Sequence, residues 1–134
     1  MLTPDDTALA LSAADGVFDD PADPRLTAEF LADPRHAICV AVDGGTVVGF
    51  ASGVRYVHPD KPSEFWINEV GVAPTHRRRG LAKAILTELL DFARREGCRE
   101  AWVLTDEING PARALYASVG GEEKRGVVQV DFQL

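Results

Sequence analysis

The chain has 134 residues, of which 46% are hydrophobic and 26% are charged. This length suits one hydrophobic core, so we expect a single domain over residues 1–134. The net charge of -7 argues against a nucleic-acid-binding protein, which usually presents a basic face. No signal peptide or membrane-spanning run is recognisable, so we expect a cytoplasmic protein without a membrane partner. Cys39 and Cys98 lack metal-ligand spacing, so we expect free thiols and no metal site.

The first part of the chain predicts two short helices and a β-hairpin. Thr3 is a suitable N-cap for a first helix, which extends towards Phe18 and ends at the Asp- and Pro-rich residues 19–24. A second helix is expected over residues 25–32. Next come an apolar strand over residues 37–42, the turn Asp43-Gly44-Gly45, and a long strand over residues 46–56, so the two strands are antiparallel neighbours.

The second part predicts a strand–helix–strand crossover with parallel strands. Its members are a strand over residues 65–72, an amphipathic helix over 79–96 that Gly97 ends, and a strand over 101–105. A further helix is expected over residues 111–119. Apolar residues then alternate with polar ones over 127–132, which predicts a closing strand.

The junction between the strand ending at Val72 and the following helix predicts an anion site. Gly80 and Ala82 are small enough for a ligand to approach the backbone. The free N–H groups of a first helical turn and the helix dipole favour a negative group such as a pyrophosphate. Arg77, Arg78 and Arg79 could instead form a solvated patch. The segment has neither the phosphate-loop nor the dinucleotide-binding pattern.

Two motifs together resemble the GNAT family of N-acetyltransferases. Arg77-x-x-Gly80-x-Ala82 after a Val-x-Val strand is similar to that family's acetyl-CoA loop. The second motif is an Asn followed at three, six and seven residues by Ala, Leu and Tyr, here Asn109, Ala112, Leu115 and Tyr116. The resemblance covers about residues 38–132.

This resemblance implies an α/β GNAT-like fold with a mixed, twisted sheet and helices on both faces. Relatives open with a strand, whereas only Met1-Leu2 precede Thr3 here, so we expect that N-terminal strand to be short or missing. In the family a bulge near Gly71 separates this strand from its neighbour. The backbone around Val70 and Val72 then pairs with the pantetheine arm. Gly71 itself also suits a close backbone approach.

The implied cosubstrate is acetyl-CoA, and its expected binding residues are Val70, Gly71, Val72, Arg77, Arg78, Arg79, Gly80, Leu81, Ala82, Lys83, Asn109 and Tyr116. Asn109 can cap a helix or bind the ligand. In relatives the tyrosine stands near the sulfur of the cofactor. Tyr116 is therefore a candidate acid that protonates the departing thiolate, the alternative being a tyrosine packed on the core.

Two acidic residues are candidates for the base that deprotonates the amine. Glu69 interrupts an otherwise apolar strand, where an unpaired charge is costly, so it either serves catalysis or substrate binding or forms a structural ion pair. Glu64 is a second candidate base or a contact for a substrate ammonium.

The strand and loop residues look most like those of aminoglycoside 3-N-acetyltransferases. The implied function is acetyl transfer from acetyl-CoA to a primary amine of a small molecule, aminoglycoside-like in character. Other acceptors are a polyamine, an amino acid or a protein N-terminus. A non-catalytic acyl-CoA-binding module is the alternative from another class. A homodimer is compatible with either function.

Overall fold

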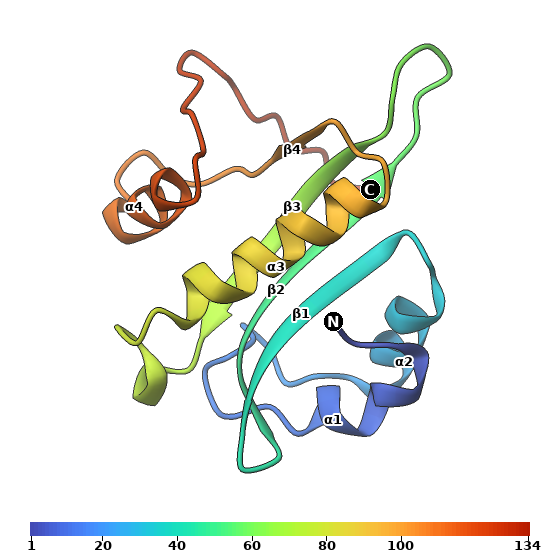
Figure 1. The fold of residues 1–134 in the computed structure, drawn as a ribbon, viewed down its shortest axis with the longest axis vertical. Helices are drawn as coiled ribbons and strands as arrows, with labels where there is room; N and C mark the ends of the chain where they lie inside the picture. Colours follow the sequence, from blue (N-terminus) through green and yellow to red (C-terminus); the bar gives the residue numbers. More distant parts are fainter.

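The computed structural model describes residues 1–134 as a mixed four-stranded sheet, in the order β1-β2-β3-β4, with helices on both faces (Figure 1). β1, β2 and β3 are antiparallel neighbours, and β4 is parallel to β3. In chain order the elements are η1 (Pro4–Asp6), α1 (Thr7–Leu11), α2 (Pro24–Ala32), β1 (His36–Asp43), β2 (Thr46–Tyr56), β3 (Glu64–Val72), η2 (Pro74–His76), α3 (Leu81–Arg95), β4 (Glu100–Trp102) and α4 (Gly110–Ser118). The α/β architecture expected from the sequence is confirmed.

Alternating side chains divide the core between the two faces of the sheet. On one face the strands pack against the apolar stripe of α3, with a buried set formed by Ala37, Cys39, Ala51, Phe65, Ile67, Ile85, Leu86, Leu89 and Ala93. On the other face they pack against α1, α2 and the loop between these helices, with a buried set formed by Ala10, Val17, Leu31, Ile38, Val47, Val48, Phe50 and Ala73. Figure 1 shows α3 crossing the near face of the sheet. None of the helices is long and apolar enough to cross a membrane.

β3 and β4 separate soon after they meet. Their ladder ends at the pair Trp66 and Trp102, so residues 67–72 of β3 have one edge without a partner strand. Nearby, Ser52 of β2 pairs with Glu69 and Gly53 pairs with Ile67, which leaves Asn68 as an extra residue in β3. This bulge reverses the alternation of β3, so the side chains after it exchange faces.

The bulge therefore lies at Asn68 rather than near Gly71, where the family resemblance placed it. Glycine is required at position 71 because the backbone of another segment approaches it closely, which is the second explanation that the sequence suggested. A Cβ atom at Gly71 would lie 2.5 Å from the Val17 carbonyl oxygen and 2.8 Å from the Phe50 ring. The loop between α1 and α2 can therefore cross β3 at this point.

Several predicted boundaries differ from the structure. The first helix ends at Leu11 because Ser12 and Ala14 instead exchange backbone hydrogen bonds with Val47 of β2. α3 begins at Leu81, not at residue 79, because Gly80 has a left-handed φ of 75°. No strand precedes η1, and only one bond, from Leu2 N–H to the Ile38 carbonyl, joins residues 1–3 to β1. The expectation of a short or missing first strand is confirmed.

The prediction was wrong at the far edge of the sheet. β4 stops at Trp102 instead of Thr105, and residues 127–132 do not form a strand. An alternating pattern becomes a strand only where another strand accepts and donates its backbone hydrogen bonds. No backbone hydrogen bond joins residues 122–134 to the sheet.

Candidate active site

The loop between β3 and α3 presents a row of free backbone donors. No N–H group from Arg77 to Lys83 donates a hydrogen bond to backbone or side chain, and α3 has no side-chain cap. The first bond of the helix runs from Ala84 N–H to the Gly80 carbonyl, at 3.1 Å. Because the helix dipole adds partial positive charge at the same place, this row can bind an anion such as a pyrophosphate.

Two left-handed residues shape this loop. Gly80 has a φ of 75° and Arg78 a φ of 62°, and the second is uncommon for a residue with a side chain. A Cβ atom at Gly80 would meet no atom within 4 Å, so backbone conformation, not space, requires glycine there.

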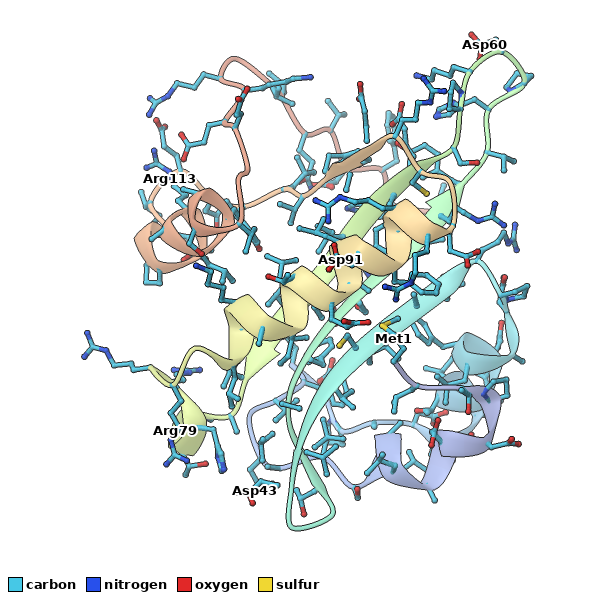
Figure 2. The ribbon with its side chains drawn as sticks, viewed as in Figure 1. Met1, Asp43, Asp60, Arg79, Asp91 and Arg113 are labelled. Atoms are coloured by element: carbon cyan, nitrogen blue, oxygen red, sulfur yellow. The ribbon has the colours of Figure 1, made fainter.

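Polar contacts hold the loop in place. The His76 Nε2 atom lies 2.9 Å from Asp43 Oδ2 in the β1–β2 hairpin. Arg77 Nε donates to the Val72 carbonyl, and Arg79 donates to the Thr75 carbonyl, each at 3.3 Å. Figure 2 shows Arg79 at the turn that precedes α3.

Beside the loop lies a cavity of about 360 Å³ between the free edge of β3 and α4. Its lining residues are Val70, Gly71, Val72, Arg77, Ala82, Asn109, Pro111, Ala112, Leu115 and Tyr116. Seven of the residues expected to bind the cofactor are therefore gathered around one space. They are Val70, Gly71, Val72, Arg77, Ala82, Asn109 and Tyr116. Arg78, Arg79, Gly80, Leu81 and Lys83 do not line the cavity but belong to the adjoining loop and first turn of α3.

Asn109 caps α4 and still has a free group for a ligand. Its Oδ1 atom accepts a hydrogen bond from Ala112 N–H at 3.1 Å. The amide Nδ2 has no hydrogen-bond partner in the chain, and the residue lines the cavity. The two functions suggested for Asn109 by the sequence are therefore compatible.

Tyr116 stands between this cavity and a second one of about 240 Å³, lined by residues of α3 and β4. Its ring packs against the core under α3, and its hydroxyl makes no hydrogen bond. Burial raises the pKa of the Tyr116 phenol above its usual value, because the charged form loses solvation. The phenol is therefore a protonated donor at neutral pH.

Glu69 differs in its environment from the sequence expectation. The separation of β3 from β4 leaves its side chain exposed instead of buried, and no cation lies within ion-pair distance. Surrounding protein raises its carboxyl pKa, and the negative charge of Asp19 in the α1–α2 loop adds to that increase. Asp19 also has no ion-pair partner, so two unpaired carboxylates face this side of β3. No sequence motif marked Asp19.

Glu64 has a different environment at the other end of β3. Its carboxylate accepts a hydrogen bond from the Tyr56 hydroxyl and lies 3.2 Å from Lys61 Nζ. These contacts lower its pKa below the usual value. The Tyr56 hydroxyl in turn accepts a hydrogen bond from Trp102 Nε1 at 2.6 Å, so the cluster ties β4 to β2. This geometry favours a structural role for Glu64.

No group of three or more His, Cys, Asp or Glu side chains is arranged to hold a metal ion. The two cysteines are not bonded to each other.

Comparisons with known proteins agree with this geometry. The family model described as the Acetyltransferase (GNAT) family matches residues 7–120. The N-alpha-acetyltransferase RimI of Mycobacterium tuberculosis is 41% identical over 104 residues, which are 78% of this chain and 63% of that protein. The chain thus spans less than two thirds of the length of this curated relative.

Two solved structures share the fold. An aminoglycoside acetyltransferase from an uncultured soil metagenomic sample, in complex with sisomicin, matches with a TM-score of 0.84 and 18% identity, over 99% of this chain and 93% of that one. The aminoglycoside acetyltransferase AAC(6')-Iy, in complex with a bisubstrate analogue of CoA, matches with a TM-score of 0.80 and 21% identity, over 99% and 95%. Both matches extend over the segment that follows α4.

Proposed function

Because this chain belongs to the GNAT family of acetyltransferases, we propose that residues 1–134 form one catalytic domain that transfers an acetyl group from acetyl-CoA to a primary amine. The observation that carries the proposal is the continuous row of free N–H groups from Arg77 to Lys83 beside a cavity of about 360 Å³. The row suits a pyrophosphate, and the free edge of β3 suits an extended arm that carries amides.

The residues around the cavity supply what acyl transfer needs. Acetyl-CoA brings a reactive thioester, which the amine attacks to form an amide and release a thiolate. N–H groups near Val70 to Val72 can polarise the thioester carbonyl, as an oxyanion hole does. The Tyr116 hydroxyl can give its proton to the thiolate, since its raised pKa keeps it protonated.

We assign Glu69 as the base that removes a proton from the ammonium group of the acceptor, directly or through a water molecule. A carboxylate with a raised pKa is a better proton acceptor than an ordinary one. Glu69 and Asp19 have no cationic partner in the chain, so a cationic acceptor would supply the missing charge. This favours an acceptor with at least one ammonium group.

Two classes of acceptor have support. The fold matches include an aminoglycoside acetyltransferase in complex with sisomicin, and a relative 41% identical is named N-alpha-acetyltransferase RimI. We propose a small aminoglycoside-like amine as the first acceptor to test and a peptide α-amine as the second. A polyamine and an amino acid are the remaining acceptors to test.

The test is steady release of CoA thiol with each acceptor in turn, with the acetylated product identified by mass spectrometry. We expect turnover with at least one ammonium-bearing acceptor. Binding of acetyl-CoA without turnover on any of them would instead support the non-catalytic acyl-CoA-binding module.

Tyr116→Phe is expected to lower turnover by about tenfold or more, which is near the low end for loss of an acid catalyst. The Tyr116 hydroxyl makes no hydrogen bond in the chain, so thermal stability should be nearly unchanged. Turnover and melting temperature measured on the same sample check this.

Tyr56 is the matched control, since the chain contains only two tyrosines. Its hydroxyl is bonded to Glu64 and Trp102, so Tyr56→Phe should cost about 1–3 kcal/mol of stability and change turnover by less than about threefold. If Tyr116→Phe instead loses stability and activity together, Tyr116 acts through packing. Full activity would remove it from the mechanism.

A further inference from the structure

The second cavity, of about 240 Å³, lies at the point where β3 and β4 separate. It is lined by Ile67, which follows the last paired residue of β3, and by Val103, which follows Trp102 at the end of β4. The cavity that we assign to acetyl-CoA is lined further along the same free edge, by residues 70–72. The two cavities therefore follow one another along the unpaired edge of β3.

The anion loop fixes the direction in which acetyl-CoA would run along this edge. A pyrophosphate on the free N–H groups from Arg77 to Lys83 would lie beyond the end of β3, so the arm leaving it would pass Val72 before Val70. The thioester end would then point towards Ile67. Tyr116, the candidate acid for the sulfur, is the one residue that lines both cavities. The acyl group on that sulfur is thus directed towards the second cavity.

The lining of the second cavity suits an aliphatic chain. Leu90 and Ala93 of α3 form one wall, and Ala101 of β4 and Val103 form another. The charged residues of the lining are all exposed, so they lie at its outer rim. The volume of about 240 Å³ exceeds that of the methylene groups by which a hexanoyl chain is longer than an acetyl group, each of roughly 30 Å³, about the volume of a liquid water molecule.

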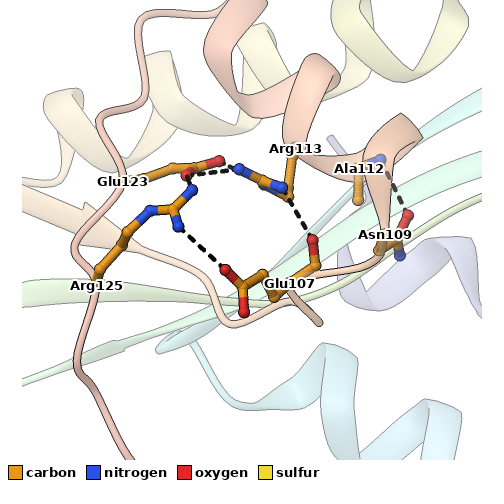
Figure 3. Close-up of polar contacts among 6 residues, drawn as sticks. All are labelled: Glu107, Asn109, Ala112, Arg113, Glu123 and Arg125. Atoms are coloured by element: carbon orange, nitrogen blue, oxygen red, sulfur yellow. Dashed lines mark hydrogen bonds and ion pairs between the residues drawn. The ribbon is translucent and has the colours of Figure 1, made fainter.

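Polar contacts hold the wall that α4 contributes. Gly120 and Gly121, which follow this helix, line the second cavity, and the Gly121 N–H donates to the Tyr116 carbonyl at 2.9 Å. Arg113 of α4 contacts both carboxylate oxygens of Glu123, at 2.7 and 3.0 Å (Figure 3). These contacts keep the segment after α4 against the helix, so the wall beside Tyr116 has a defined position.

We propose that the second cavity receives the chain of acyl-CoA donors longer than acetyl-CoA, so that the protein binds and transfers unbranched aliphatic acyl groups of up to about six carbons. This inference rests on the function proposed above, because it uses the same residues for the chemistry. The amine nitrogen forms an amide with the acyl carbon and the C–S bond breaks. The amine proton passes to Glu69, and the thiolate takes a proton from Tyr116.

The test compares acetyl-CoA, butyryl-CoA and hexanoyl-CoA in two measurements on the full chain. Isothermal titration calorimetry gives the affinity for each donor, and thiol release with one ammonium-bearing acceptor gives kcat/KM. We expect affinity to rise about fourfold for each methylene group that leaves water. The kcat/KM for butyryl-CoA should be no less than about a third of that for acetyl-CoA.

Ala101→Phe fills the second cavity from β4. Ala101 pairs with the buried Phe65, so its side chain lies on the α3 side of the sheet, and it is exposed, so a ring has room there. This variant should bind hexanoyl-CoA only about as tightly as acetyl-CoA, while its affinity and turnover for acetyl-CoA change by less than about threefold. Leu104→Phe is the matched control, since Leu104 is exposed and lines neither cavity, and it should keep the rise with chain length.

The inference fails if the unchanged protein binds the longer donors no more tightly than acetyl-CoA, and acetyl-CoA turnover would then still support the proposed function. It also fails if Ala101→Phe keeps the rise in affinity, because the chain would be bound elsewhere. Transfer of butyryl at least about 100-fold slower than acetyl would overturn it as well. A rise in affinity that Ala101→Phe abolishes, without turnover of any donor, supports the cavity and contradicts the proposed function instead.

Discussion

Gly80→Val is expected to abolish acetyl-CoA binding at concentrations where the unchanged protein is saturated. Gly80 has a φ of 75°, which costs a β-branched residue roughly 1–3 kcal/mol and forces the loop from Arg77 to Lys83 to change course. The free N–H groups would then no longer converge on one anion. We expect affinity to fall by about 100-fold or more, or about 2.7 kcal/mol, measured by isothermal titration calorimetry.

Gly97→Val is the matched control at the other end of α3. Gly97 has a φ of 81° and, like Gly80, open space where a Cβ atom would be, so the backbone strain is similar. It lies outside the cavity and the loop. The two variants should therefore lose similar stability while only Gly80→Val loses binding. Unchanged affinity in a folded Gly80→Val protein would refute the assignment of the loop.

Glu69→Gln is expected to lower turnover by about 100-fold or more while acetyl-CoA affinity is retained. The substitution keeps the shape of the side chain and removes the proton acceptor. Glu69 does not line the cavity that we assign to acetyl-CoA, so binding there should be unaffected. Glu64→Gln, on the same strand, is the control and should change turnover by less than about threefold, since Glu64 is already engaged by Tyr56 and Lys61.

The pH dependence gives an independent check on Glu69. A base acts in its deprotonated form, so turnover should fall as the pH drops through the pKa of Glu69, which lies above the ordinary 4.5. Asp19→Asn removes one cause of that increase and should move the fall to lower pH. If neither Glu69→Gln nor Asp19→Asn changes the pH profile of turnover from that of the unchanged protein, another group accepts the proton.

Much of the fold could be predicted because local patterns determine it. The Gly44-Gly45 turn, with both φ angles positive, sets the β1–β2 hairpin, and the apolar stripe of α3 places that helix on the sheet. The left-handed turn at Gly80 and the helix cap at Asn109 have short-range signals too, whereas Tyr116 was selected only by its place in the family motif.

What the sequence did not reveal depends on distant neighbours. Residues 127–132 form a strand only if a neighbouring strand pairs with them, and the pattern of residues does not identify that neighbour. The bulge at Asn68 and the separation of β3 from β4 are properties of strand pairing, so Glu69 was expected in a buried strand although it is exposed. Asp19 lies in an acidic loop, and the sequence gives no reason to choose it over Asp20. Only the packing of Val17 over Gly71 shows that this loop crosses β3.

The most direct measurement is amide hydrogen exchange of the protein with and without acetyl-CoA. The central claim is that free N–H groups from Arg77 to Lys83, together with the unpaired edge of β3 over residues 67–72, bind this molecule. On saturation, we expect exchange to slow in both segments, and the β1–β2 hairpin should be unaffected. Unchanged exchange from Arg77 to Lys83 in protein saturated with acetyl-CoA would contradict the account, because the ligand would then be bound elsewhere.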